Sequence, residues 1–267
     1  MLPMSKLMHT GRSLLELLLV SAVGLIPIVS GLTVMFYQLE RKLDENARIS
    51  AQEALFAIDR RLDSLLLTAS SASQFSGQAC DNVIEQLRAM TASDPRIHSL
   101  ELTKDDLAYC STLPTIIPHH IDITAGRTVR LNFDSPTTPN GVMVEYRLSD
   151  DGPGIIATSY GIELRRELQG FQDGLVLVLE FEDAYLWSQG DSRDQQQPSQ
   201  SEFFRSAPST RHDYRVNVGY PAGYTLAEAR TLMVQVLPSL TLVGLLTAAI
   251  AYWGILRARR KRERTTA

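Results

Sequence analysis

The chain has 267 residues, of which 44% are hydrophobic and 21% charged, and its formal net charge is −4 at pH 7. Eight of the basic residues lie in short flanks outside two apolar stretches, and the segment between these stretches holds 28 acidic and 18 basic residues. This acidic balance excludes nucleic acid as a partner, because neutralising phosphates requires a basic face.

Two apolar stretches are each long enough to cross a lipid bilayer. We predict transmembrane helices at residues 14–37, of which 17–37 are uncharged, and at residues 232–256. A helix needs about 20 apolar residues to span the ~30 Å of hydrocarbon. The first stretch is longer than the apolar core of a signal peptide and no small-residue cleavage site follows it, so we expect an uncleaved anchor.

The flanking charges predict the orientation of the chain. Residues 1–13 contain Lys6 and Arg12, and residues 257–267 contain six basic residues against Glu263. Short flanks rich in Lys and Arg stay in the cytoplasm. We therefore expect a two-pass protein with both termini in the cytoplasm, the lipid bilayer as its surroundings, and residues 38–231 exported as one domain.

Cys80 and Cys110 are the only two cysteines of the chain. An exported domain experiences oxidising conditions, so the pair predicts a disulfide. The chain-entropy model assigns a bridge that closes a loop of about 30 residues roughly 3–4 kcal/mol of stabilisation. The chemistry leaves open whether the bridge is only structural or also a switch. A zinc site formed by the cysteines with His119 and His120 is a further alternative.

A long helix is predicted to continue from the first span into the exported domain. No Pro or Gly occurs between Gly31 and Gly77, and apolar residues recur there at spacings of three and four. This spacing is typical of one apolar stripe on an amphipathic helix. Such a rod can transmit a displacement between the membrane and the exported domain. The stripe consists of Leu39, Leu43, Ala47, Ala51, Leu55, Ile58, Leu62 and Leu65.

The remaining elements predict an α+β fold with a mostly antiparallel sheet. Cys80 begins a second helix, and after Pro95 the apolar period changes to two, which predicts a hairpin. Residues 189–202 are polar and are predicted to form an exposed loop, and a capping-box pattern at Thr225 begins the helix that becomes the second span. Strands are predicted at 97–102, 107–110, 128–133, 141–148, 154–159, 174–181 and 213–218, and a short helix at 162–168.

Common catalytic motifs are missing from the sequence. It contains no G-x-S-x-G, H-E-x-x-H, P-loop or Gly-rich dinucleotide fingerprint. We therefore expect a chain without catalytic residues, cofactor or metal.

Two resemblances to known families, one short and one extensive, bear on function. Residues 11–17, Gly-Arg-Ser-Leu-Leu-Glu-Leu, are similar to the processing site of type IV pilins. Arg12 stands where an apolar residue is usual, and a pilin has no use for a second span with a basic tail. A pilin-like protein is therefore a minor alternative.

The more extensive resemblance runs from the first span to the end of the second. Cys80 begins a helix after a long membrane-linked rod, and Leu107-Ala108-Tyr109-Cys110-Ser111-Thr112 follows some 30 residues later. Together with residues 51–63 and 214–221, these features resemble the CSS-motif domain, the periplasmic sensory region of bacterial cyclic-di-GMP phosphodiesterases. Cys110, Ser111 and Thr112 occupy the motif. Thr112 stands where the family usually has a second serine, and it keeps the hydroxyl.

The resemblance implies a sensor in the bacterial inner membrane. It implies that a periplasmic dithiol oxidase forms the bridge between Cys80 and Cys110, and that reduction activates a linked phosphodiesterase. In the family an EAL phosphodiesterase domain follows the second span, whereas eleven residues follow Leu256 here, without the family's catalytic carboxylates. We therefore expect a non-catalytic sensor that acts through an EAL-type phosphodiesterase or another membrane partner, or as a homodimer. The alternative is a membrane-anchored binding or structural domain whose disulfide only adds stability.

Overall fold

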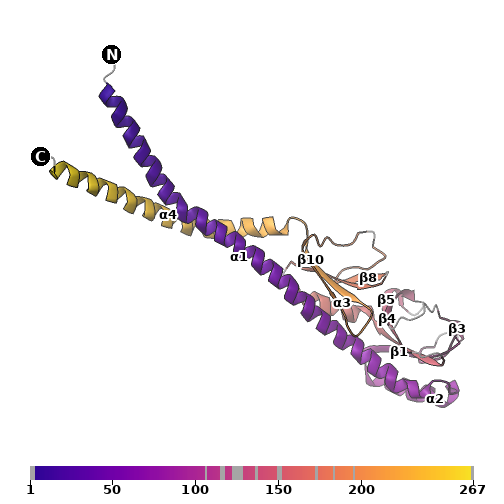
Figure 1. Ribbon diagram of the computed structural model, residues 1–267. Coiled ribbons are helices and arrows are strands. Elements are labelled where there is room, and N and C mark those ends of the chain that lie inside the picture. The colour runs from indigo at the N-terminus through magenta and orange to yellow at the C-terminus, as the bar shows by residue number, and fades with distance from the viewer. Residues whose placement is uncertain are drawn as a thin grey trace. The chain divides into compact units, whose positions relative to one another are not determined.

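A computed structural model describes residues 4–105, 107–114, 118–121, 129–135, 138–148, 152–171, 174–182, 184–194 and 196–265, with side chains described between residues 15 and 261. The fold is α+β, as the sequence predicts (Figure 1). The chain forms two compact units. One comprises Met1–Leu43 and Gly223–Ala267, and the other comprises Asp44–Ala222.

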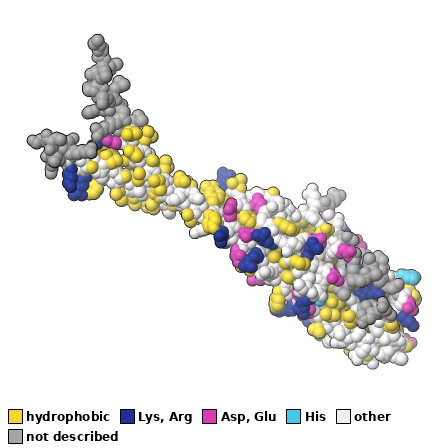
Figure 2. Space-filling view, viewed as in Figure 1, with side chains coloured by type: hydrophobic (Ala, Val, Ile, Leu, Met, Phe, Trp, Pro, Cys, Tyr) yellow, Lys and Arg dark blue, Asp and Glu magenta, His cyan; other side chains and the backbone are white. Residues whose placement is uncertain are grey.

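The first unit consists of two helical segments, the beginning of α1 (Met4–Ala72) and the whole of α4 (Tyr224–Thr265). Both helices are long and apolar enough to cross a membrane. Large apolar side chains are exposed on both helices, among them Leu25 on α1 and Leu245 on α4. Figure 2 shows apolar side chains gathered on the surface of these helices. An exposed apolar surface of this kind suits contact with lipid. A helix can lie within the bilayer because it satisfies its own backbone hydrogen bonds.

Small residues let α1 and α4 approach each other closely within this unit. A Cβ atom added at Gly244 of α4 would lie 2.6 Å from the carbonyl oxygen of Gly24 on α1. At Gly24, an added Cβ would lie 3.0 Å from Ala248 Cβ. Membrane helices commonly pack through small residues of this kind, since van der Waals contact replaces the hydrophobic driving force that exists in water.

The second unit includes the remaining part of α1, where the predicted apolar stripe is largely confirmed. The stripe differs from the prediction at one position, because Ala54 is buried and Leu55 is only half-buried. Beyond Leu65 it continues for two further turns, through Ala69 and Ala72. Its buried members in this unit are Ala47, Ala51, Ala54, Ile58, Leu62, Leu65, Ala69 and Ala72.

The first sheet has six antiparallel strands in the order β3-β2-β1-β6-β5-β4. The predicted hairpin corresponds to β1 and β2, and α2 (Cys80–Ser93) packs on both strands with Val83 and Leu87 buried. Central strands β1 and β6 hold the core residues Leu100, Leu102 and Ile155. The strands are β1 (Ile97–Lys104), β2 (Leu107–Ser111), β3 (His119–His120), β4 (Val129–Ser135), β5 (Thr138–Leu148) and β6 (Gly154–Tyr160).

The second sheet has four antiparallel strands in the order β8-β7-β10-β9. Its strands are β7 (Val176–Phe181), β8 (Ala184–Trp187), β9 (Glu202–Pro208) and β10 (Arg215–Tyr220), and α3 (Gly161–Gln169) precedes them. β8 and β9, like the two-residue β3, were not predicted from the sequence. β8 has only four residues, and β9 is an edge strand with mostly exposed side chains, so neither has a clear apolar alternation.

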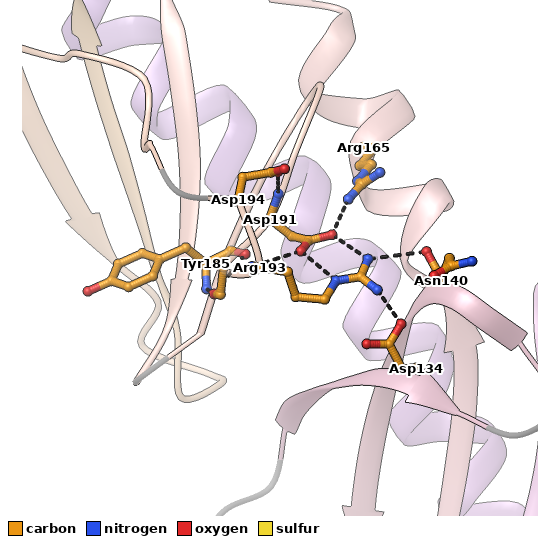
Figure 3. A network of polar contacts seen from close by, with 8 residues as sticks. Asp134, Asn140, Arg165, Tyr185, Asp191, Arg193 and Asp194 are labelled. Carbon is orange, nitrogen blue, oxygen red and sulfur yellow. Dashed lines mark hydrogen bonds and ion pairs between the residues drawn. The ribbon is translucent and has the colours of Figure 1, made fainter.

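The predicted exposed loop at 189–202 is only partly exposed, because Asp191 is 3% exposed and belongs to a polar network that reaches α3 and β4 (Figure 3). Its carboxylate accepts hydrogen bonds from Arg165 of α3 at 2.6 Å and from Arg193 at 2.9 Å. Arg193 also donates to Asp134 of β4 at 2.5 Å. The hydrogen bonds from Arg193 hold the pKa of Asp191 below its usual range. This network ties the loop of the second sheet to the end of the first sheet.

Candidate functional site: the cysteine pair and the polar contacts of the long helix

A disulfide joins Cys80 to Cys110, which are 30 positions apart in the sequence, and the two Cα atoms are 5.3 Å apart. Cys80 is the first residue of α2. Cys110 lies in β2, opposite Leu102 of β1. The bond therefore ties the N-terminal end of α2 to the hairpin on which the helix packs.

Two hydrogen bonds position the segment that leads into Cys80. The backbone N–H of Gly77 donates to the Tyr109 hydroxyl on β2 at 2.9 Å. Ser76 Oγ donates to the carbonyl oxygen of Gly154 at the start of β6, at 3.3 Å. Gly77 has a φ of +81°, which a side chain would strain, so glycine suits the turn that brings α2 to the sheet.

The two hydroxyl residues after Cys110 fasten β2 to β1. Thr112 Oγ1 accepts a hydrogen bond from the backbone N–H of Leu100 at 3.1 Å, and its own N–H donates to the Leu100 carbonyl at 3.0 Å. Ser111 Oγ donates to Glu101 Oε1 at 2.9 Å. The contact of Thr112 needs only a hydroxyl oxygen, so serine would also serve at this position.

Glu101 carries a largely buried carboxyl, whose side chain is 14% exposed, beside the cysteine-bearing hairpin. Burial raises its pKa, while the hydrogen bond from Ser111 and the proximity of His119 act in the opposite direction. His119 Nε2 lies 3.6 Å from Glu101 Oε2. Burial disfavours the charged form of a carboxyl, so Glu101 holds its proton to higher pH than an exposed glutamate.

The predicted zinc alternative is not assembled in the structure. The sulfur atoms of Cys80 and Cys110 are bonded to each other, and His119 lies beside Glu101. Within the described residues, no three His, Cys, Asp or Glu side chains come together in a way that could hold a metal ion.

A second set of polar contacts lies on α1. Asp59 is 8% exposed, and its Oδ1 accepts hydrogen bonds from the Tyr214 hydroxyl at 2.7 Å and from Ser209 Oγ at 2.8 Å. The Tyr214 hydroxyl also lies 3.1 Å from the carbonyl oxygen of Leu55. Burial and the neighbouring Asp59 raise the pKa of Tyr214, which keeps its hydroxyl protonated as a donor. These contacts join α1 to the segment that precedes β10.

One turn further along α1, Asp63 makes the corresponding contacts with the same segment. Its Oδ1 lies 3.1 Å from Nε2 of the buried His212, and its Oδ2 accepts from Arg211 at 2.7 Å. On the other side of the ring, His212 Nδ1 lies 3.3 Å from the Tyr146 hydroxyl on β5. The long helix is therefore linked by side-chain hydrogen bonds to both sheets.

The sequence comparison places the cysteine pair in a known family. Residues 43–233, well over half of the chain, match the family model described as "CSS motif domain associated with EAL". The chain belongs to the CSS-motif domain family. It therefore contains a sensory domain, and the resemblance noted from the cysteine spacing and motif is confirmed. No curated protein sequence matches this CSS-motif chain.

Three solved structures resemble this CSS-motif chain in fold. The extracellular domain of the candidate histidine kinase rpHK1S-Z16 is 13% identical, with a TM-score of 0.47, covering 72% of this chain and 98% of that one. The extracellular domain of the candidate histidine kinase soHK1S-Z6 is 13% identical, with a TM-score of 0.46, covering 72% and 99%. The sensor domain of the V. cholerae histidine kinase DctB is 14% identical, with a TM-score of 0.36, covering 71% and 98%.

The polar residues through which α1 of this CSS-motif domain contacts the sheets were not predicted from the sequence. Asp59 and Asp63 are four positions apart and flank the buried Leu62, so they lie on one side of the helix next to its apolar stripe. A carboxylate adjoining the core face was the available signal. Their partners His212 and Tyr214 are about 150 residues away in the sequence, and nothing local predicts that contact.

Proposed function

We propose that this chain is a two-pass inner-membrane sensor that responds to the redox state of Cys80 and Cys110. Its signal would pass to an EAL-type phosphodiesterase or another membrane partner, and so to cyclic-di-GMP levels. The observation that carries the proposal is the disulfide at the family motif, which fixes one end of α2 to the hairpin. The family's description as associated with EAL supports the class of partner.

The size of the bridge's contribution supports a switch. A 30-residue loop gives about 3.6 kcal/mol in the chain-entropy model. The 14-residue α2 buries only Val83 and Leu87, and two such side chains contribute about 3–6 kcal/mol. The disulfide thus contributes about as much to holding α2 as its buried apolar side chains do. Reduction would therefore loosen α2 on the sheet.

The contacts of α2 with its surroundings suggest a route to the membrane. Asp94, which ends α2, is contacted by Ser64 of α1 at 3.5 Å and is held by Arg96 at 2.7 Å. From residue 4 to residue 72, α1 is one uninterrupted helix. A change in the position of α2 would alter the contacts of α1, and a continuous helix can carry that change along its length.

The proposal includes the topology of the chain. Residues 1–13 and 257–267 would lie in the cytoplasm, residues 14–37 and 232–256 in the inner membrane, and residues 38–231 in the periplasm. A reporter that is active only in the periplasm should be active when fused after Gln197 and silent when fused at Ala267. The opposite pattern would overturn the proposal.

In the same proposal, a periplasmic dithiol oxidase forms the bridge and reduction is the activating signal. The test is the double variant C80S/C110S, expressed in cells with and without an EAL-type partner. Cyclic-di-GMP levels should change only when the partner is present. The matched control is T112S, which keeps both cysteines and the hydroxyl that contacts Leu100. Equal levels for wild type and C80S/C110S in the presence of a responsive partner would refute redox signalling.

A specific observation also favours a second candidate, an anchored binding or structural domain with a purely structural bridge. Cys110 is 0% exposed, as is usual for a disulfide that only stabilises a core. In that case C80S/C110S would lower the stability of the domain and leave cyclic-di-GMP unchanged. Redox-dependent association, either of two copies of this chain or with the partner, would favour the sensor.

A further inference from the structure

The two cysteines of the disulfide differ in exposure. Cys110 is 0% exposed, in a strand that has β1 and β3 on either side. Cys80 is partly exposed, and the residues around it, Gly77–Ala79 and Asp81, are exposed. Thiol–disulfide exchange begins when an external thiolate reaches one sulfur of the bond. Within the described part of the chain, the Cys80 side of the bond is the exposed one.

The position of Cys80 on α2 adds a second asymmetry. It is the first residue of the helix, and the preceding Ala79 provides no side-chain hydrogen bond to the first turn. The positive end of a helix dipole stabilises a thiolate at this position, which favours Cys80 as the nucleophile once the bond is open. Asp81 opposes this effect, but its charge is exposed to solvent and screened. Cys110 lies in β2 and not at a helix N-terminus, so its thiolate lacks this stabilisation.

We propose that Cys80 is the exchange site through which a dithiol–disulfide oxidoreductase acts on this domain, an inference that deepens the proposed function. During reduction, a partner thiolate attacks Cys80 Sγ, a mixed disulfide forms at Cys80, and Cys110 leaves as a thiolate that takes up a proton. The partner's second thiolate then attacks the partner sulfur that is bonded to Cys80. Cys80 leaves as a thiolate that takes up a proton. The partner dithiol is thereby oxidised to a disulfide, and the domain gains two thiols.

Oxidation follows the same path in reverse. The Cys80 thiolate attacks the disulfide of the oxidised partner, and the mixed disulfide again forms at Cys80. Cys110 then resolves it from within the domain. The exposed residues around Cys80 are therefore the surface that the partner contacts in both directions.

The test on the wild-type full chain uses glutathione as the probe. The detergent-solubilised oxidised protein is treated briefly with reduced glutathione, free thiols are blocked with N-ethylmaleimide, and the peptides are mapped by mass spectrometry. We expect glutathione on Cys80 and the maleimide on Cys110, at least about tenfold in excess of the reverse, the ratio given by a barrier difference of 1.4 kcal/mol. Glutathione found mainly on Cys110, or equally on both, would overturn the inference.

Two single variants give a matched comparison, because C110S and C80S both lack the bridge. Glutathione disulfide should modify Cys80 in C110S at least about tenfold faster than Cys110 in C80S. In denaturant the two rates should converge, and equal rates in the folded proteins would again overturn the inference. The outcome is separable from that of the proposed function. Unchanged cyclic-di-GMP levels in C80S/C110S would refute redox signalling but would not affect where glutathione attaches in the wild-type chain. A glutathione adduct on Cys110 would refute only the assignment of Cys80.

Discussion

Reduction of the disulfide should release the segment that it encloses and leave the second sheet intact. The bridge closes a 30-residue loop containing α2 and β1, and the chain-entropy model gives it about 3.6 kcal/mol. This stabilisation affects only openings that separate Cys80 from Cys110. Where amide hydrogen exchange occurs through such local openings, the backbone amides of α2 should exchange their hydrogens a few hundredfold faster after reduction. Amides of β7 and β10 are held by a separate strand ladder and should keep their rates.

Hydrogen–deuterium exchange with mass spectrometry on the full-length protein in detergent, with and without reductant, measures this effect peptide by peptide. Reduction leaves every side chain in place, so no cavity is introduced. The variant C80A/C110A serves as the control, because reductant should cause no further change in it. Unchanged protection of α2 after reduction would refute the reasoning. Equal loss of protection in β10 would show that the bridge holds the whole domain, as a structural disulfide does.

Three further predictions concern other contacts. Y214F removes a hydrogen bond to the buried Asp59 and should lower the free energy of unfolding, measured by denaturant titration, by about 2 kcal/mol. The control Y185F should change this free energy little, because the Tyr185 hydroxyl makes no hydrogen bond in the described part of the chain. The raised pKa of Glu101 means that stability from its protonation is complete below the unfolded-state pKa and is lost as pH rises through the folded-state pKa. E101Q should remove this loss, so the melting temperature of E101Q should rise relative to that of wild type as pH increases. Parallel plots of melting temperature against pH for the two proteins would contradict the assignment. G244I should lower the melting temperature of the detergent-solubilised chain because its side chain would meet the Gly24 carbonyl, while G254I, which meets nothing within 4 Å, should not.

The sequence alone determined the features that depend on neighbours along the chain. The spacing of Ala47, Ala51, Ile58 and Leu62 predicted a helix with one buried stripe, because a repeat of 3.6 residues returns side chains to the same face. The sequence predicted β1, β2, β5 and β6 in nearly their observed positions, and the alternation of apolar residues carried the prediction of β1. The motif around Cys110 indicated the family, since it is a short run of specific residues.

Only the tertiary structure decided how the strands divide into two sheets and which polar groups are buried. β9 has mostly exposed side chains, and its place in the sheet comes from hydrogen bonds to β10, which no local pattern encodes. Asp191 lies in a polar loop that the sequence predicted as exposed, and it is buried because Arg165 and Arg193 supply the charge and hydrogen bonds that compensate its desolvation. Asp59 is buried for the same kind of reason, with Tyr214 as its donor. Arg165 is 26 positions from Asp191 and Tyr214 is 155 positions from Asp59, so these contacts exist only in the folded chain.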